Sequence, residues 1–293
     1  MNEYVDGYHA DSCDSLVLCL STMQSLFLTY KSSRIHYQRT GNGRRPLIAF
    51  HGYSDSANSF NLLEEYMGND FTLIAIDLPF HGKTDWKEGL IFRPVDLIEI
   101  MNAILEDLSL PHSKIYLLGF SMGGRIALSL FQNIPREIDK IILLAADGLH
   151  ISKWYWLATQ TWLGNALFRF TAKYPGWFFA MLHTGKKIKL IKQNVYKFSL
   201  SSMQEKKLRD DLYKRWTTMR KFTTNLRKLQ SLVLTNKTQV RLIYGEYDHI
   251  IFANGAEKFM IGIEQYCQLS ILPCGHHVLV EKNLEAIIRL IRE

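Results

Sequence analysis

The sequence predicts an α/β fold in which a mostly parallel central sheet carries helices on both faces. Short apolar runs, such as residues 47–50 and 71–76, alternate with segments whose apolar residues recur at helical spacing, such as residues 59–67. This alternation specifies parallel strands joined by crossover helices. The chain has 293 residues, 47% of them hydrophobic, which is enough for one large core or for a core that carries an insertion.

The expected elements follow from these runs and from the breakers between them. Two strands, residues 26–30 and 34–37, flank a polar turn at residues 31–33. The Gly-rich stretch 40–46 is expected to form a turn before the first buried strand. In chain order, the elements expected after this turn are a strand at 47–50, a helix at 59–67, a strand at 71–76, a loop at 77–84, a helix at 95–108, a strand at 115–118, a helix at 125–131, a strand at 138–146, a strand at 240–244, a helix at 255–261, a strand at 267–272 and a helix from Leu284.

The alternation of strands and helices stops near Asp147. From residue 151 to about residue 235 the apolar and basic residues follow helical spacing, which is interrupted at Gly164 and again at residues 175–176. We therefore predict a helical insertion at residues 151–235. The core is then made of residues 25–150 and 236–293.

Charge is distributed unevenly between these two parts. The net charge of the whole chain is +7, but residues 151–235 hold 17 Lys and Arg against three acids, a net of +14, which leaves −7 for the rest. The basic residues either solvate the outer faces of the helices or attract an anion. The anion could be a carboxylated or phosphorylated substrate, or an anionic membrane surface. Nucleic-acid binding is not expected, because no recognition motif accompanies the charge.

Cysteine usage and the N-terminal stretch indicate a cytoplasmic protein. The four cysteines lack metal-ligand spacing and the pattern of a disulfide framework, so we expect them to be reduced and buried, with no metal site. The apolar residues 15–20 follow acidic residues and no Lys or Arg, unlike a secretory signal peptide. No run of about 18 apolar residues occurs, so no membrane span is expected. Residues 1–24 are expected to be a poorly defined leader.

One short stretch, GFSMGG at residues 119–124, places Ser121 among three glycines. The apolar run before it predicts a strand, and the residues after it have helical spacing. Gly-x-Ser-x-Gly at a strand-to-helix turn is typical of a nucleophile elbow, in which the glycines permit close packing and the serine is held strained and exposed. Ser121 is therefore a candidate nucleophile.

Two further candidates follow later strands. Asp248 comes shortly after the strand at 240–244, and His276 shortly after the strand at 267–272. Residues just beyond the carboxyl ends of parallel strands share one crevice, so we expect these side chains to meet Ser121. His277 and His249 remain alternatives for the base, and Asp147, which ends an earlier strand, remains an alternative for the acid.

The order Ser, acid, His resembles the α/β-hydrolase superfamily, and the resemblance covers nearly all of residues 26–293. Five stretches carry it in family order. They are FHGY at 50–53, which resembles the His-Gly oxyanion loop, DLPFHGKT at 77–84, which resembles the Asp-x-x-x-x-Gly-x-Ser/Thr loop, the elbow at 119–123, the acid turn GEYD at 245–248, and the histidine turn at Gly275 and His276 with Glu281 after it.

The resemblance implies roles for these residues. Ser121 would attack, His276 would accept its proton, and Asp248 would orient the imidazole. The backbone N–H groups of Tyr53 and Met122 would form the oxyanion hole. The insertion would be a helical cap over the site, and no cofactor is implied. As substrate-binding residues we expect His51, Gly52, Arg125 and Trp154, one of five tryptophans in the insertion. The alternatives are that His51 stabilises its loop by hydrogen bonds, that Arg125 pairs with a neighbouring acid, and that Trp154 fills the core between the inserted helices.

The expected function is cofactor-independent cleavage of an ester or related acyl bond of a small substrate, either neutral or anionic, through an acyl-enzyme at Ser121. A lyase or carbon–carbon hydrolase with the same triad is the alternative among enzymes. Residues 121–125 are similar to the Ser-x-Gly-Gly-Arg of menaquinone-pathway synthases, whose arginine contacts a substrate carboxylate. A non-catalytic ligand binder is the alternative outside enzymes.

Overall fold

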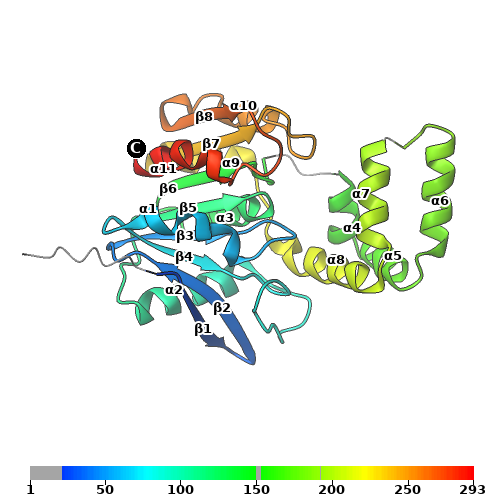
Figure 1. Ribbon diagram of the computed structural model, residues 1–293, viewed down its shortest axis with the longest axis horizontal. Coiled ribbons are helices and arrows are strands. Elements are labelled where there is room, and N and C mark those ends of the chain that lie inside the picture. Colours follow the sequence, from blue (N-terminus) through cyan, green and yellow to red (C-terminus); the bar gives the residue numbers. More distant parts are fainter. Residues whose placement is uncertain (1–21, 150–152, 192) are drawn as a thin grey trace, which may run out of the picture.

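The fold is built on one eight-stranded sheet, seen in a computed structural model (Figure 1). The model describes residues 22–149, 153–191 and 193–293, without the side chains of residues 153, 154, 194, 198 and 202. The strand order is β1-β2-β4-β3-β5-β6-β7-β8. β2 pairs antiparallel with both β1 and β4, and all other neighbouring strands are parallel. The strands are β1 Gln24–Tyr30, β2 Ser33–Thr40, β3 Arg45–Phe50, β4 Phe71–Ile76, β5 Ile115–Phe120, β6 Ile138–Leu144, β7 Gln239–Gly245 and β8 Cys267–Leu272.

Helices cover both faces of this sheet, as the sequence predicts, because alternate residues of each central strand point to opposite faces. In β3, Ile48 and Phe50 join one core cluster, and Leu47 and Ala49 join the other. The first cluster is closed by α2 (Pro94–Asp107), α3 (Met122–Asn133), α9 (Leu226–Asn236) and α10 (Asn254–Met260), and the second by the 3-10 helix η1 (Ala57–Leu63), α1 (Glu64–Met67) and α11 (Leu284–Arg292).

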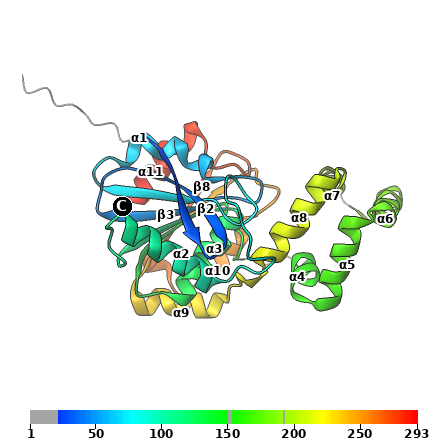
Figure 2. The same ribbon diagram turned by 90° about the horizontal axis from the view of Figure 1, so that it is seen from below.

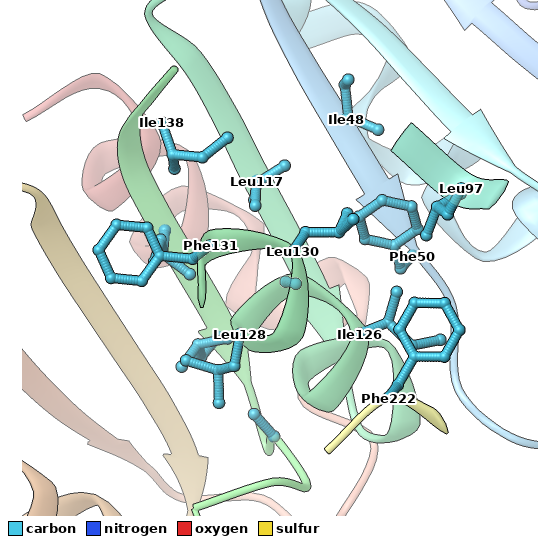
Figure 3. Packing of buried hydrophobic residues seen from close by; sticks show 14 of the residues in the cluster. Ile48, Phe50, Leu97, Leu117, Ile126, Leu128, Leu130, Phe131, Ile138 and Phe222 are labelled. Carbon is cyan, nitrogen blue, oxygen red and sulfur yellow. The ribbon is translucent and has the colours of Figure 1, made fainter. Parts of the chain in front are cut away.

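The first cluster fixes α3, the helix that follows the elbow. Figure 3 shows Ile126 and Leu130 of α3 beside strand residues, with Phe222 next to them. All of these side chains are buried, and the close packing leaves α3 one position against the sheet. The residues labelled in Figure 3 are Ile48, Phe50, Leu97, Leu117, Ile126, Leu128, Leu130, Phe131, Ile138 and Phe222.

The inserted helices α4–α8 form an arm beside the core, drawn in green to yellow in Figures 1 and 2. The helix α9, which the sequence assigns to the same insertion, instead packs on α3, and its Leu229 and Val233 lie in the first core cluster. We propose that the insertion ends near residue 225 rather than at 235. The helices of the arm are α4 Lys153–Gln160, α5 Trp162–Lys173, α6 Gly176–Lys187, α7 Gln193–Met203 and α8 Lys206–Thr218.

Two smaller expectations concern cysteines and the chain start. Cys267 and Cys274 are free thiols, the first half-buried and the second buried, and burial raises the pKa of Cys267 to about 12. Cys13, Cys19 and the predicted leader up to residue 21 lie outside the described residues. Among the helices that the structure describes, none is long and apolar enough to cross a membrane. The cytoplasmic location stays a prediction.

Candidate active site

Ser121 lies at the sharp turn between β5 and α3. Its φ is 51° and its ψ is −115°, a region that costs a non-glycine residue about 1–3 kcal/mol. Neighbouring backbone holds it there, because the Ser121 N–H donates to the Leu144 carbonyl (2.9 Å) and the Ser121 carbonyl accepts from the Asp147 N–H (2.9 Å). The surrounding sheet therefore enforces the conformation that turns this hydroxyl toward the crevice.

The glycines around Ser121 have no room for side chains. A Cβ on Gly119 would lie 2.6 Å from the Gly123 carbonyl oxygen, and a Cβ on Gly123 would overlap the Phe50 carbonyl. The start of α3 thus lies directly against β3 and β5. Glycine is required here by close approach, as the GFSMGG motif predicts.

We expect Gly123→Ala to lower the free energy of unfolding by about 2–4 kcal/mol, because the new methyl group meets backbone that cannot yield. Urea denaturation measures the change. Gly176→Ala is the matched control: Gly176 also lies in a first helical turn but has nothing within 4 Å of its Cβ position, so its change stays within about 1 kcal/mol. Equal effects of the two substitutions would contradict the packing argument.

The loops after β7 and β8 carry the acid and the histidine. They are tied together by backbone bonds from the Glu246 N–H to the Leu272 carbonyl (2.8 Å) and from the Tyr247 N–H to the Cys274 carbonyl (2.9 Å). Gly245 allows this approach, since a Cβ there would meet the carbonyl of Gly275. The paired loops bring the side chains of Asp248 and His276 to one point.

The three predicted residues form a chain of hydrogen bonds. The His276 Nε2 lies 3.0 Å from the Ser121 Oγ, and the His276 Nδ1 lies 2.8 Å from the Asp248 Oδ2. The other oxygen of Asp248 accepts the N–H groups of Ile250 (2.7 Å) and Ile251 (3.0 Å). Burial raises the pKa of Asp248, but the hydrogen bonds from His276 and these two N–H groups outweigh it and hold the pKa below its usual value.

The alternative residues occupy other places. His277 borders the same cavity, but no hydrogen bond of its ring occurs within the described part of the chain, and its ring lies 5.8 Å from that of Phe120. His249 is exposed. Asp147 forms an ion pair with Arg125 (3.0 Å) instead of reaching a histidine.

The predicted oxyanion donors are free to bind. Met122 is the first residue of α3, so its N–H has no partner inside the helix, and Tyr53 follows the His-Gly pair. Across the residues that the structure describes, neither N–H donates a hydrogen bond. Both residues, with Gly52, line the cavity that contains Ser121.

His51, expected to contact substrate, lies away from this cavity. It is completely buried, its Nε2 accepts the Leu78 N–H (3.1 Å), and its Nδ1 therefore carries the proton donated to the Gly52 carbonyl (2.8 Å). Burial lowers the pKa of His51, which favours this neutral form. His51 thus anchors the loop that presents the Tyr53 N–H. Sequence alone separates a loop anchor from a ligand poorly, because both follow the same strand.

The cavity has a volume of about 620 Å³ and a mostly apolar wall. Tyr155 of α4 and Trp216 of α8 close it from the arm, while Trp154 has a side chain outside the described residues. Tyr155 was not predicted, although it lies in an aromatic run between two tryptophans. The remaining wall includes Phe120, Leu149, Leu226, Ile250, Ile251 and Phe252.

Arg125 reaches this cavity, as predicted, but its charge is already matched. It is buried, pairs with Asp147, and has its guanidinium 4.3 Å from the centre of the Tyr155 ring. The Arg125 Nε and the Tyr155 hydroxyl are buried without a hydrogen-bond partner in the structure. The charge of Arg125 beside the cavity is therefore already matched by Asp147.

The sheet order and the elbow define the class of the protein, an α/β-hydrolase. The chain belongs to the serine aminopeptidase S33 family, whose family model matches residues 41–283. Membership in this family of the α/β-hydrolase class agrees with the resemblance found in the sequence. The described residues contain no group of three or more His, Cys, Asp or Glu side chains that could hold a metal.

Known proteins resemble the chain over parts of its length. It is 34% identical over 39% of its length to the uncharacterized hydrolase YugF of Bacillus subtilis (strain 168), of which it spans 40%. It is 28% identical over 48% of its length to the pimeloyl-[acyl-carrier protein] methyl ester esterase of Vibrio parahaemolyticus, of which it spans 51%. A putative lipase from Acinetobacter baumannii AYE has the same fold, with a TM-score of 0.62 and 20% identity over 92% of this chain and 90% of that one.

Proposed function

We propose that the protein is a serine esterase that cleaves a carboxylic ester through an acyl-enzyme on Ser121. The observation that carries the proposal is the hydrogen-bond chain from Ser121 through His276 to Asp248, which opens into the apolar cavity. A serine hydroxyl is a weak nucleophile near neutral pH, and an adjacent imidazole that accepts its proton is the usual means of activating it.

The geometry supports the following sequence of steps. As the Ser121 Oγ attacks the ester carbonyl, the His276 Nε2 takes its proton, and Asp248 stabilises the resulting imidazolium. The carbonyl oxygen becomes an oxyanion that accepts the N–H groups of Tyr53 and Met122, each worth roughly 3 kcal/mol of barrier. His276 then returns the proton to the leaving alkoxide. Water, activated by the same imidazole, releases the acid and restores Ser121.

The cavity favours an uncharged acyl group of moderate length. Its wall is apolar, and its one buried cation, Arg125, is neutralised by Asp147. The Vibrio relative, named as a methyl ester esterase, supports ester cleavage. A lyase that grips a carboxylate with Arg125 is less well supported, because Asp147 already occupies that guanidinium.

Hydrolysis of p-nitrophenyl esters of increasing chain length tests the proposal. We expect turnover by the wild type, with kcat/KM higher for medium acyl chains than for acetate, and loss of at least about 10³-fold in Ser121→Ala. Ser54→Ala is the matched control, because Ser54 lines the same cavity but has no hydrogen bond to a histidine in the described structure; its kcat stays within about threefold. Turnover that survives in Ser121→Ala would overturn the proposal.

A further inference from the structure

The arm presents an apolar face that nothing in the structure covers. Leu163, Leu167 and Phe170 of α5, with Tyr174 at its C-cap, are called here the α5 stripe. They follow one another at intervals of three or four residues, so they share one side of the helix. Their exposed fractions are 71%, 50%, 51% and 52%. A helix in a soluble domain normally turns such a stripe toward the core.

The opposite side of α5 makes the contacts that hold this helix in the arm. The Phe168 ring packs against those of Tyr213 (5.4 Å) and Trp216 (5.8 Å) of α8, and the Asn165 Nδ2 donates to the Thr217 Oγ1 (3.1 Å). Thr171 and Ala172 are buried on this inner side. The stripe is therefore additional to the contacts that hold the arm together.

The same contacts show that the stripe does not face the active-site cavity. The arm reaches that cavity through Tyr155 of α4 and Trp216 of α8, whose rings lie 5.2 Å apart. Phe168 points from α5 toward Trp216, so the stripe on the other side of α5 points away from it. The contacts through which the arm closes the cavity therefore leave the α5 stripe exposed.

The charges around the α5 stripe indicate which kind of partner it can bind. Residues 153–203, which form α4 to α7, contain eight Lys and Arg and no Asp or Glu. Arg169 and Lys173 lie on α5 itself and are exposed, as are Lys186, Lys187 and Lys189 at the end of α6. Two such arms would repel each other, which disfavours a second copy of this chain as the occupant. An apolar stripe with flanking cations matches the boundary of an anionic lipid layer.

We propose that the α5 stripe docks the protein on anionic membrane surfaces. The apolar side chains enter the boundary between headgroups and acyl chains, while the lysines and arginines lie among the acidic headgroups. Figures 1 and 2 both show the arm that contains α5 projecting from the sheet. Binding does not depend on Ser121, and Ser121→Ala is expected to bind as the wild type does.

Vesicle flotation of the full chain tests this proposal. We compare vesicles of phosphatidylcholine alone with vesicles containing about one third phosphatidylglycerol, at low and high salt. The expected result is at least about tenfold stronger partitioning onto the anionic vesicles, weakened by salt. Equal partitioning onto both kinds of vesicle, or none onto either, would overturn the proposal, as would association of the protein with itself through the stripe in sedimentation velocity.

Two double variants test whether the α5 stripe is the surface that binds the membrane. Leu163→Asn with Leu167→Asn is expected to reduce partitioning at least about tenfold, because both side chains would leave the apolar layer. Val95→Asn with Leu234→Asn is the control, since these exposed side chains lie on α2 and α9 of the core; it is expected to bind within about twofold of wild type. Unchanged binding of the folded stripe variant, checked by circular dichroism, would refute the assignment to α5.

Discussion

Replacement of His276 by Ala is expected to lower kcat for an ester substrate by at least about 10³-fold, with a much smaller change in KM. His276 is the residue whose Nε2 lies 3.0 Å from the Ser121 Oγ, so its loss leaves the hydroxyl without a proton acceptor. Binding in the apolar cavity does not involve this proton transfer, which is why KM is spared. Steady-state kinetics on a p-nitrophenyl ester measures both constants.

The adjacent His277 provides the matched control. It borders the same cavity but lacks a hydrogen bond within the described residues, so His277→Ala should change kcat by less than about tenfold. The reverse pattern, in which His277→Ala is inactive and His276→Ala is active, would show that the wrong histidine carries the proton.

Replacement of Asp248 by Asn is expected to lower kcat by about 10³–10⁴-fold while the fold is retained. The carboxylate accepts the Nδ1 proton of His276, and this holds the imidazole in the tautomer whose Nε2 faces Ser121. An amide group in place of that oxygen would present its own protons to Nδ1, and the opposite tautomer would follow. The imidazolium would also lose its counter-charge.

Asp147→Asn tests whether Asp147, rather than Asp248, is the acid of the triad. Asp147 pairs with Arg125, so its substitution should act on KM more than on kcat, with less than about tenfold loss of kcat. If Asp147→Asn lost as much kcat as Asp248→Asn, the acid at the end of β6 would have to take part in proton transfer.

The sequence predicts the central strands well, because β3, β4 and β5 are apolar along most of their length and are buried on both faces. β4 occupies residues 71–76 and β8 occupies residues 267–272, as expected, and the three strands between them in the chain differ by one or two residues at their ends. The expected helix at 59–67 is instead mostly the 3-10 helix η1 followed by one turn of α1. Its apolar residues Phe60 and Leu63 lie three apart, a spacing that both kinds of helix satisfy.

The proposed end of the insertion, near residue 225, depends on a contact that the sequence pattern does not record. Leu229 and Val233 of α9 are spaced as one apolar face, and such spacing shows that a helix is buried on one side without showing which partner covers it. The partner is α3, reinforced by the Asn225 N–H donating to the Gln132 Oε1 (2.7 Å). That contact joins residues 93 positions apart.

The candidate site, too, could be predicted from the sequence only in part. Ser121, Asp248 and His276 could be proposed from sequence because each follows a strand of one parallel sheet, and the structure brings them within hydrogen-bonding distance. The place of Tyr155 depends on how the arm meets the core, and the pairing of Arg125 with Asp147 depends on how α3 lies against the end of β6. No local sequence pattern records either contact. The buried His51 was expected at the cavity because its strand ends there.

Labelling with a fluorophosphonate, followed by mapping of the modified peptide by mass spectrometry, tests the central claim that Ser121 is an activated nucleophile. The account predicts a single modified site on the wild type, at Ser121. It predicts no modification of folded Ser121→Ala, and labelling of His276→Ala slowed by at least about 10³-fold. Labelling of folded Ser121→Ala at the wild-type rate, or a folded wild type that does not react, would contradict the claim.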